Sequence, residues 1–82
     1  MRFGDLVEYD LTASHGGQIE QATVIGEPGY SDGTVVMLAT EKAIGMPINV
    51  RHCRVIASGN ESPAEELRAR YAKKFPGALK PR

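Results

Sequence analysis

Five short runs of β-type residues, separated by turn-forming residues and with no helical pattern between them, fill most of the first 57 residues of this 82-residue chain. The runs lie at residues 6–11, 19–25, 34–39, 46–50 and 53–56. The first alternates apolar and acidic residues, which is typical of a strand with one buried face. The third is continuously apolar and β-branched, which favours a strand buried on both faces. Because closure protects strand edges, the pattern predicts a mainly β fold with a five-stranded antiparallel barrel, closed or nearly closed.

The segments between these runs are rich in turn-forming residues. Residues 12–18 include His15 and two adjacent glycines, which predicts a mobile loop. A second loop, residues 26–33, ends in the pair Asp32 and Gly33, which favours a tight turn into the next strand. A single helical turn is expected around residues 49–52, before the closing strand.

A helical pattern follows the strands, over residues 62–76. Ser62 is predicted to cap the helix, with Pro63 at its first position and Glu65 completing a capping box. An apolar stripe runs along one side of this helix: Ala64, Leu67, Tyr71 and Phe75. The chain is therefore expected to form one small domain: a barrel over residues 1–57, a linker at 58–61, the helix, and a frayed basic tail at 77–82.

The order of these pieces resembles the SH3-like small β-barrels, including the KOW and Tudor types. The likeness covers residues 4–57 and depends on three segments, residues 4–9, 32–36 and 53–56. It implies a fold and no particular activity, because such barrels serve many functions.

Residues 4–7 and 53–56 also resemble the framework of the plasmid-borne type B dihydrofolate reductases, which are SH3-like barrels of this length. Those enzymes form a tetrameric pore lined by a Val-Gln-Ile-Tyr segment on the fourth strand. The corresponding stretch here, residues 45–48, has neither the Gln nor the Tyr. The resemblance therefore does not carry the activity over to this chain.

Charge is distributed unevenly along a chain whose net charge is zero. Residues 1–60 hold seven acids and four bases, whereas residues 61–82 hold three acids and six bases, so the two parts carry −3 and +3. Six bases within so short a segment could contact several phosphates, with an aromatic side chain offering a stacking face. The predicted nucleic-acid-binding residues are Arg68, Arg70, Lys73, Lys74, Lys80 and Arg82. The leading hypothesis is a non-catalytic binding module for nucleic acid or a nucleoprotein assembly.

Other interpretations of the same features stay open. The basic helix could be an ordinary solvated face, since bases near a helix C-terminus complement its dipole, or it could dock on an acidic protein or on an acidic barrel, its own or that of another copy. The second functional hypothesis is a protein–protein adaptor or inhibitor that uses the acidic loops. Its predicted contact residues are Glu27, Tyr30, Asp32, Leu67, Tyr71 and Phe75. The stripe of Leu67, Tyr71 and Phe75 could equally belong to the core or to an interface between copies.

Little in the sequence indicates catalysis. His52 and Cys53 are neighbours, but adjacent residues of an extended segment point to opposite faces, so a Cys–His nucleophile pair is not expected. Asp5, Glu8 and Asp10 lack the His or Cys partners of a metal cluster, and no cofactor is predicted. One cysteine forms no intramolecular disulfide, and no run of apolar residues is long enough to span a bilayer. A cytoplasmic location is therefore expected.

Overall fold

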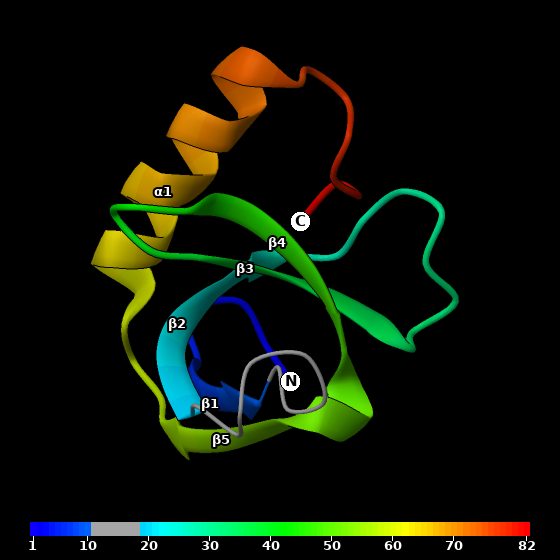
Figure 1. The fold of residues 1–82 in the computed structure, drawn as a ribbon. Helices are drawn as coiled ribbons and strands as arrows, with labels where there is room; N and C mark the ends of the chain where they lie inside the picture. The colour runs from blue at the N-terminus through cyan, green and yellow to red at the C-terminus, as the bar shows by residue number, and fades with distance from the viewer. Residues whose placement is uncertain (11–18) are drawn as a thin grey trace.

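The computed structural model describes residues 1–10 and 19–82, which form a five-stranded sheet followed by one helix (Figure 1). The predicted loop at residues 12–18, with His15 in it, lies outside the described residues. The elements, in chain order, are β1 (Leu6–Asp10), β2 (Ile19–Gly26), β3 (Val35–Ala39), β4 (Ile44–Asn49), the 3₁₀ turn η1 (Val50–His52), β5 (Cys53–Ala57) and α1 (Glu61–Lys74).

The strands pair in the order β4-β3-β2-β1-β5, and every pairing is antiparallel. The predicted fold class is thus confirmed: the molecule is mainly β, with five antiparallel strands and a C-terminal helix. The sheet curls strongly, as Figure 1 shows, but among the described residues no strand pairing joins β4 to β5. The sheet therefore keeps two outer edges, where the sequence suggested a closed or nearly closed barrel.

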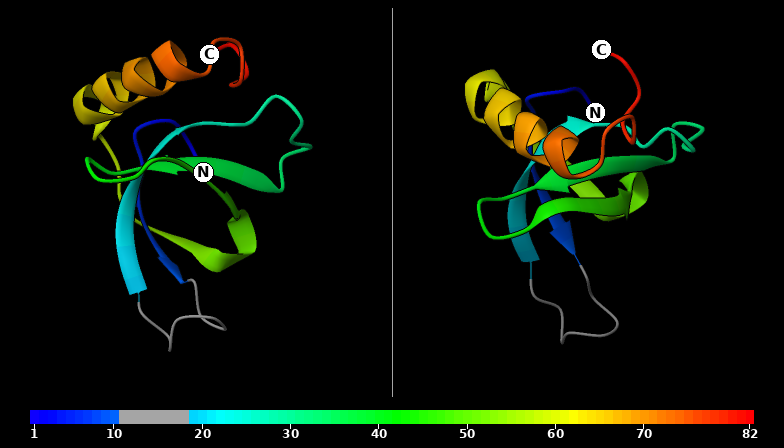
Figure 2. Two further views of the ribbon diagram at one scale, coloured as in Figure 1. Left: turned by 45° about the horizontal axis from the view of Figure 1, so that its top comes forward. Right: turned by 90° about the horizontal axis from the view of Figure 1, so that it is seen from above.

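The sheet has apolar side chains on both of its faces, which form two separate clusters. The concave side holds a cluster from β1, β2 and β3: Val7, Tyr9, Ala22, Val24, Val36 and Leu38. The other side holds Ile25, Met37 and Ala39 together with Leu67 and Tyr71 of α1. Because successive side chains of a strand point to opposite faces, Leu38 and Met37 enter different clusters. This explains the continuous apolar run of β3, and Figure 2 shows the helix lying across that second face.

Helix α1 begins one residue earlier than expected, at Glu61, and ends at Lys74. The predicted capping box is wrong. Asn60 is the cap residue, its side chain makes no capping hydrogen bond, and Ser62 lies inside the first turn. The helix is held by packing, since Ala64 is fully buried and Leu67 and Tyr71 are 7% and 9% exposed. Phe75, the last member of the predicted stripe, is 52% exposed and does not join the core.

Tyr71 can pack on the sheet because residue 45 is a glycine. Gly45 is the extra residue of β4 between the partners of Leu38 and Ala39, and its φ is +99°. A Cβ atom at this position would overlap the Tyr71 ring. The glycine thus provides both the left-handed backbone conformation and the space for the helix.

The C-terminal tail (residues 78–82) is docked on the sheet, so the prediction of a frayed tail is wrong. The Gly29 amide donates to the Ala78 carbonyl at 2.9 Å, and the Lys80 amide donates to the Glu27 carbonyl at 2.9 Å. Between them, Leu79 forms an isolated antiparallel bridge with Pro28. The tail therefore runs as a short extended segment beside the loop that follows β2 (Figure 2).

Candidate functional site

Arg68, one of the six predicted nucleic-acid-binding cations, is used inside the molecule. Its Nη1 donates to the Ile25 carbonyl at 2.7 Å, and its Nη2 donates to the Lys80 carbonyl at 2.9 Å. The guanidinium lies against Gly26, where a Cβ atom would collide with Nη1. Desolvation, with a smaller contribution from Arg82, lowers the pKa of Arg68 from its ordinary value. Arg68 of α1 is thus hydrogen-bonded to both β2 and the C-terminal tail.

Three further predicted cations are paired with acidic side chains of the same chain. Arg70 contacts Glu66 one helical turn earlier at 2.6 Å, and Arg82 contacts Glu65 at 3.1 Å. The Arg82 guanidinium also lies 3.6 Å from the centre of the Phe3 ring. Lys80 donates to the Ser31 carbonyl at 2.6 Å and approaches Glu27 at 3.5 Å. Three of the six predicted cations therefore form ion pairs with glutamates of the same chain.

The last two predicted cations, Lys73 and Lys74, lie exposed in the final turn of α1. Neither is paired with a carboxylate of the described residues. Phe75 follows them, and its ring contacts the Tyr71 ring with centroids 5.1 Å apart at an interplanar angle of 41°. We call these three residues, Lys73, Lys74 and Phe75, the helix-end surface. It combines two positive charges, unpaired among the described residues, with an exposed aromatic ring that packs against the Tyr71 ring.

The acidic loop predicted for protein binding makes mostly internal contacts. Glu27 accepts a hydrogen bond from the Ser31 hydroxyl at 2.9 Å, in addition to its contact with Lys80. Asp32 accepts from the Thr34 hydroxyl at 2.7 Å and from the Thr34 amide at 3.2 Å, and these two bonds hold the pKa of Asp32 below its ordinary value. Tyr30 is the exception, since it is 75% exposed.

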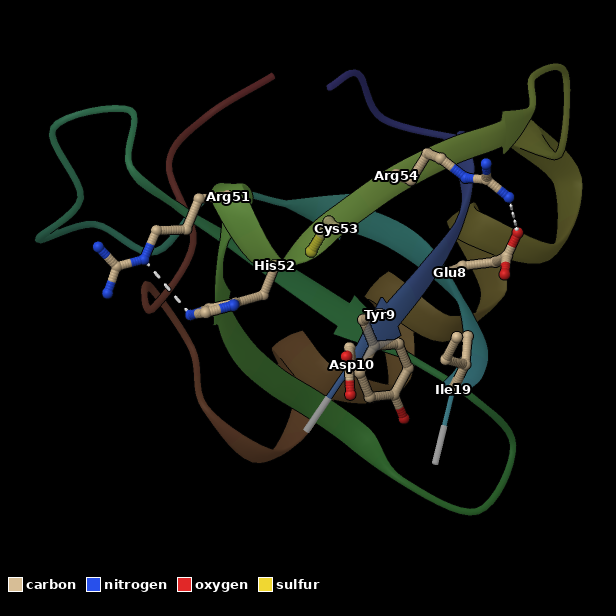
Figure 3. Close-up of a pocket in the computed structure, with 8 residues that line it drawn as sticks. All are labelled: Glu8, Tyr9, Asp10, Ile19, Arg51, His52, Cys53 and Arg54. Carbon is tan, nitrogen blue, oxygen red and sulfur yellow. Dashed lines mark hydrogen bonds and ion pairs between the residues drawn. The ribbon is translucent and has the colours of Figure 1, made fainter. Parts of the chain in front are cut away.

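A groove of about 430 Å³ lies where β1 and β2 meet η1 and β5 (Figure 3). Its described lining mixes charges with apolar atoms: Glu8, Tyr9, Asp10, Ile19, Arg51, His52, Cys53 and Arg54. Figure 3 shows Arg51 and His52 together at one side, where Arg51 Nε donates to His52 Nε2 at 3.4 Å. At the other side Arg54 contacts Glu8 at 2.6 Å, and this contact raises the pKa of Arg54.

Two further groups in the groove, Tyr9 and Cys53, have shifted pKa values. The Tyr9 side chain is almost fully buried, and its hydroxyl donates a hydrogen bond to the Glu20 carboxylate at 3.0 Å. Desolvation, reinforced by that hydrogen bond and by the Glu20 charge, raises the pKa of Tyr9 to about 12. Burial also raises the pKa of the Cys53 thiol, which donates to the Asn49 carbonyl at 3.7 Å. Both groups are therefore protonated at neutral pH.

The groove was not predicted from the sequence. The Arg51-His52-Cys53-Arg54 run contained the only signal, two arginines and a histidine within four residues. Its counterpart on β1 lies more than forty residues away in the sequence, at Glu8 and Tyr9. The neighbours His52 and Cys53 hydrogen-bond to different partners, Arg51 and the Asn49 carbonyl.

Comparison with protein-family models, with curated proteins and with solved structures gave no match. Within residues 1–10 and 19–82 there is no group of three or more His, Cys, Asp or Glu side chains that could hold a metal ion. None of the described helices is both long and apolar enough to cross a membrane.

Proposed function

We propose that this protein is a non-catalytic binding module that contacts nucleic acid, alone or within a nucleoprotein assembly, through its helix-end surface. The observation that supports this most is the state of Lys73 and Lys74, the two predicted cations without an acidic partner among the described residues. Contacts between exposed lysines and phosphates are independent of the base sequence, and an exposed aromatic ring can stack on any base. Phe75 is 52% exposed and follows Lys73 and Lys74, so we propose that its ring stacks on a base while the two lysines contact phosphates.

The scaffold that we propose for this module is SH3-like. The strand order β4-β3-β2-β1-β5, together with a one-turn 3₁₀ segment between the last two strands, supports that assignment. The free thiol of Cys53 favours a reducing compartment, and we propose the cytoplasm.

The test is a titration of a fluorescein-labelled single-stranded DNA and of a duplex of equal length, followed by fluorescence anisotropy at several salt concentrations. Removing the helix after Glu66 is not a usable test, because Leu67 and Tyr71 belong to the core. The variant is therefore the double substitution Lys73→Gln, Lys74→Gln. Each phosphate contact contributes about −0.9 to the slope of log affinity against log salt on B-DNA, and about −0.7 on single strands. The double variant should thus lose between about 1.4 and 1.8 of that slope.

Phe75→Ala is the second variant. Stacking of a base on an aromatic side chain is worth about 1–3 kcal/mol, so affinity for the single strand should fall by about fivefold or more, with the salt slope unchanged. The control is Lys42→Gln with Arg51→Gln, which removes the same charge from other exposed sites. The proposal fails if the control weakens binding as much as the helix-end variant does, or if the wild type does not bind at micromolar concentration in low salt.

A protein partner is the second candidate function. The mixed-charge groove favours it, because paired charges such as Glu8–Arg54 around an apolar floor suit a surface of mixed composition better than a polyanion. Pull-down from the native host would show a specific partner that His52→Glu or Arg51→Glu, both in the lining of the groove, removes. An unchanged partner list for both variants would contradict this alternative.

A further inference from the structure

The two outer edges of the sheet are built differently. Strand β4 carries Pro47 near its middle, opposite Met37, and a proline has no N–H with which to recruit another strand. Strand β5 has no proline and no lysine, and its outer side is unpaired among the described residues. Each of these strands also contains one extra residue, Gly45 in β4 and Ile56 in β5. The edge without a proline is thus the one that can accept a further strand.

Strand β5 exposes apolar side chains that its position would be expected to bury. Val55 lies directly opposite Val7 in the β1–β5 pairing, so the two side chains share one face of the sheet. Val7 is fully buried, but Val55 is 45% exposed, because none of the described strands lies on the outer side of β5 to cover it. Ile56 is 36% exposed as well. A neighbouring strand would cover this surface.

The centre of this edge carries no net charge. Arg54 is its single charged residue, and Glu8 of β1 neutralises it at 2.6 Å. An acidic or basic strand would therefore gain little here, whereas an apolar, neutral strand would match the edge. The β5 strand of a second copy has that composition.

We propose that two copies of this chain associate through antiparallel pairing of their β5 strands about a two-fold axis. Such an interface uses one patch twice. Among the registers that keep the two sheet faces continuous, one centred on Arg54 would place two arginines opposite each other, which is unfavourable. The register centred on Val55 instead places Val55 opposite its counterpart and Arg54 opposite Ile56.

Pairing of two five-residue strands buries less than a standard interface of about 1,200–2,000 Å². The dimer is therefore expected to be weak, with dissociation on the order of 10–500 μM.

The test is sedimentation equilibrium of the full chain from about 10 μM to 1 mM, a range that spans the expected dissociation constant. The wild type should rise from the 8.9 kDa monomer mass towards twice that value. Val55→Glu and Val55→Lys should each stay monomeric, because each places two like charges opposite each other. An equal mixture of the two variants should form a one-to-one heterodimer, since the glutamate then faces the lysine.

The control is Ile19→Glu, which alters an apolar side chain that is 62% exposed and lies outside β5. This variant should associate as the wild type does, and so should Lys73→Gln, Lys74→Gln, which separates this proposal from the proposed nucleic-acid surface. Circular dichroism confirms that each variant folds. The proposal is wrong if the wild type is monomeric at 1 mM, if its mass rises beyond a dimer, or if the mixed variants fail to pair.

Discussion

Replacement of Arg68 by methionine should destabilise the protein strongly, because this side chain joins three segments. Methionine keeps an unbranched apolar stem but removes the hydrogen bonds to the carbonyls of Ile25 and Lys80, 2.7 and 2.9 Å long. A hydrogen bond from a charged donor contributes about 1.5–3 kcal/mol. Arg68 is partly exposed, so the lower bound applies to each bond, and the expected loss is about 3 kcal/mol.

That loss is large relative to the stability of so small a domain. At about 0.05–0.15 kcal/mol per residue, a chain of this length is stable by roughly 4–12 kcal/mol. Urea unfolding measures the change directly. With a slope of about 1.5 kcal/mol per molar, the midpoint should fall by about 2 M. Arg68→Lys, which can reach one carbonyl at a time, should lose about half as much.

Arg70→Met is the matched control on the same helix. Its pair with Glu66 is exposed on both sides, so its removal should cost only about 0.3–0.5 kcal/mol. Hydrogen exchange adds a local measurement: in Arg68→Met the amides of Gly29 and Lys80, which hold the tail, should exchange faster than in Arg70→Met. Equal stability of the two variants, or a loss below about 1 kcal/mol for Arg68→Met, would refute the role assigned to Arg68.

Two further predictions concern the packing of the core. Gly45→Ala should destabilise the fold in urea unfolding by about 1–3 kcal/mol more than Gly33→Ala. Both glycines have a φ of +99°, but only a Cβ atom at residue 45 would meet the Tyr71 ring. Equal losses of stability in the two variants would contradict this. Tyr9→Phe should remove, from the ultraviolet titration of the tyrosines, a component with a midpoint near pH 12. Since the folded pKa of Tyr9 lies above its unfolded value of 10.0, its stabilising contribution is complete below pH 10 and is lost as the pH rises towards 12, so wild type and Tyr9→Phe should converge in stability over that range.

Local sequence pattern was sufficient for the class of fold. Alternation in residues 6–10 and the apolar run at residues 35–39 report which faces of a strand are buried, and that information is contained in neighbouring residues. The capping box at Ser62 was a local signal too, yet it failed. Packing of Leu67 and Tyr71 on the sheet determines where the helix lies, and the chain enters it through Asn60. Tertiary contacts outweighed the capping preference.

The use of the charged residues could not be predicted in the same way, because it depends on which distant segments meet. Nothing near Arg68 in the sequence indicates that a glycine at residue 26 leaves space for its guanidinium, or that the tail returns to the same place. The groove beside Tyr9 likewise forms only when β5 pairs with β1. Composition identified the basic segment correctly, but only the fold distinguishes cations held inside the molecule from those that face solvent.

This distinction limits the strength of the proposed nucleic-acid contact. Six bases would imply a steep dependence on salt, whereas Lys73 and Lys74 alone imply a slope of about −1.4 to −1.8 and a modest affinity for one copy. A dimer formed through β5 would carry two helix-end surfaces, and the second would then bind at a raised effective concentration wherever one strand of nucleic acid reaches both. Affinity for a long strand should therefore exceed affinity for a short one, and Val55→Glu should remove that excess while leaving the binding of short oligonucleotides unchanged. The two proposals involve separate surfaces, but length-dependent affinity requires both.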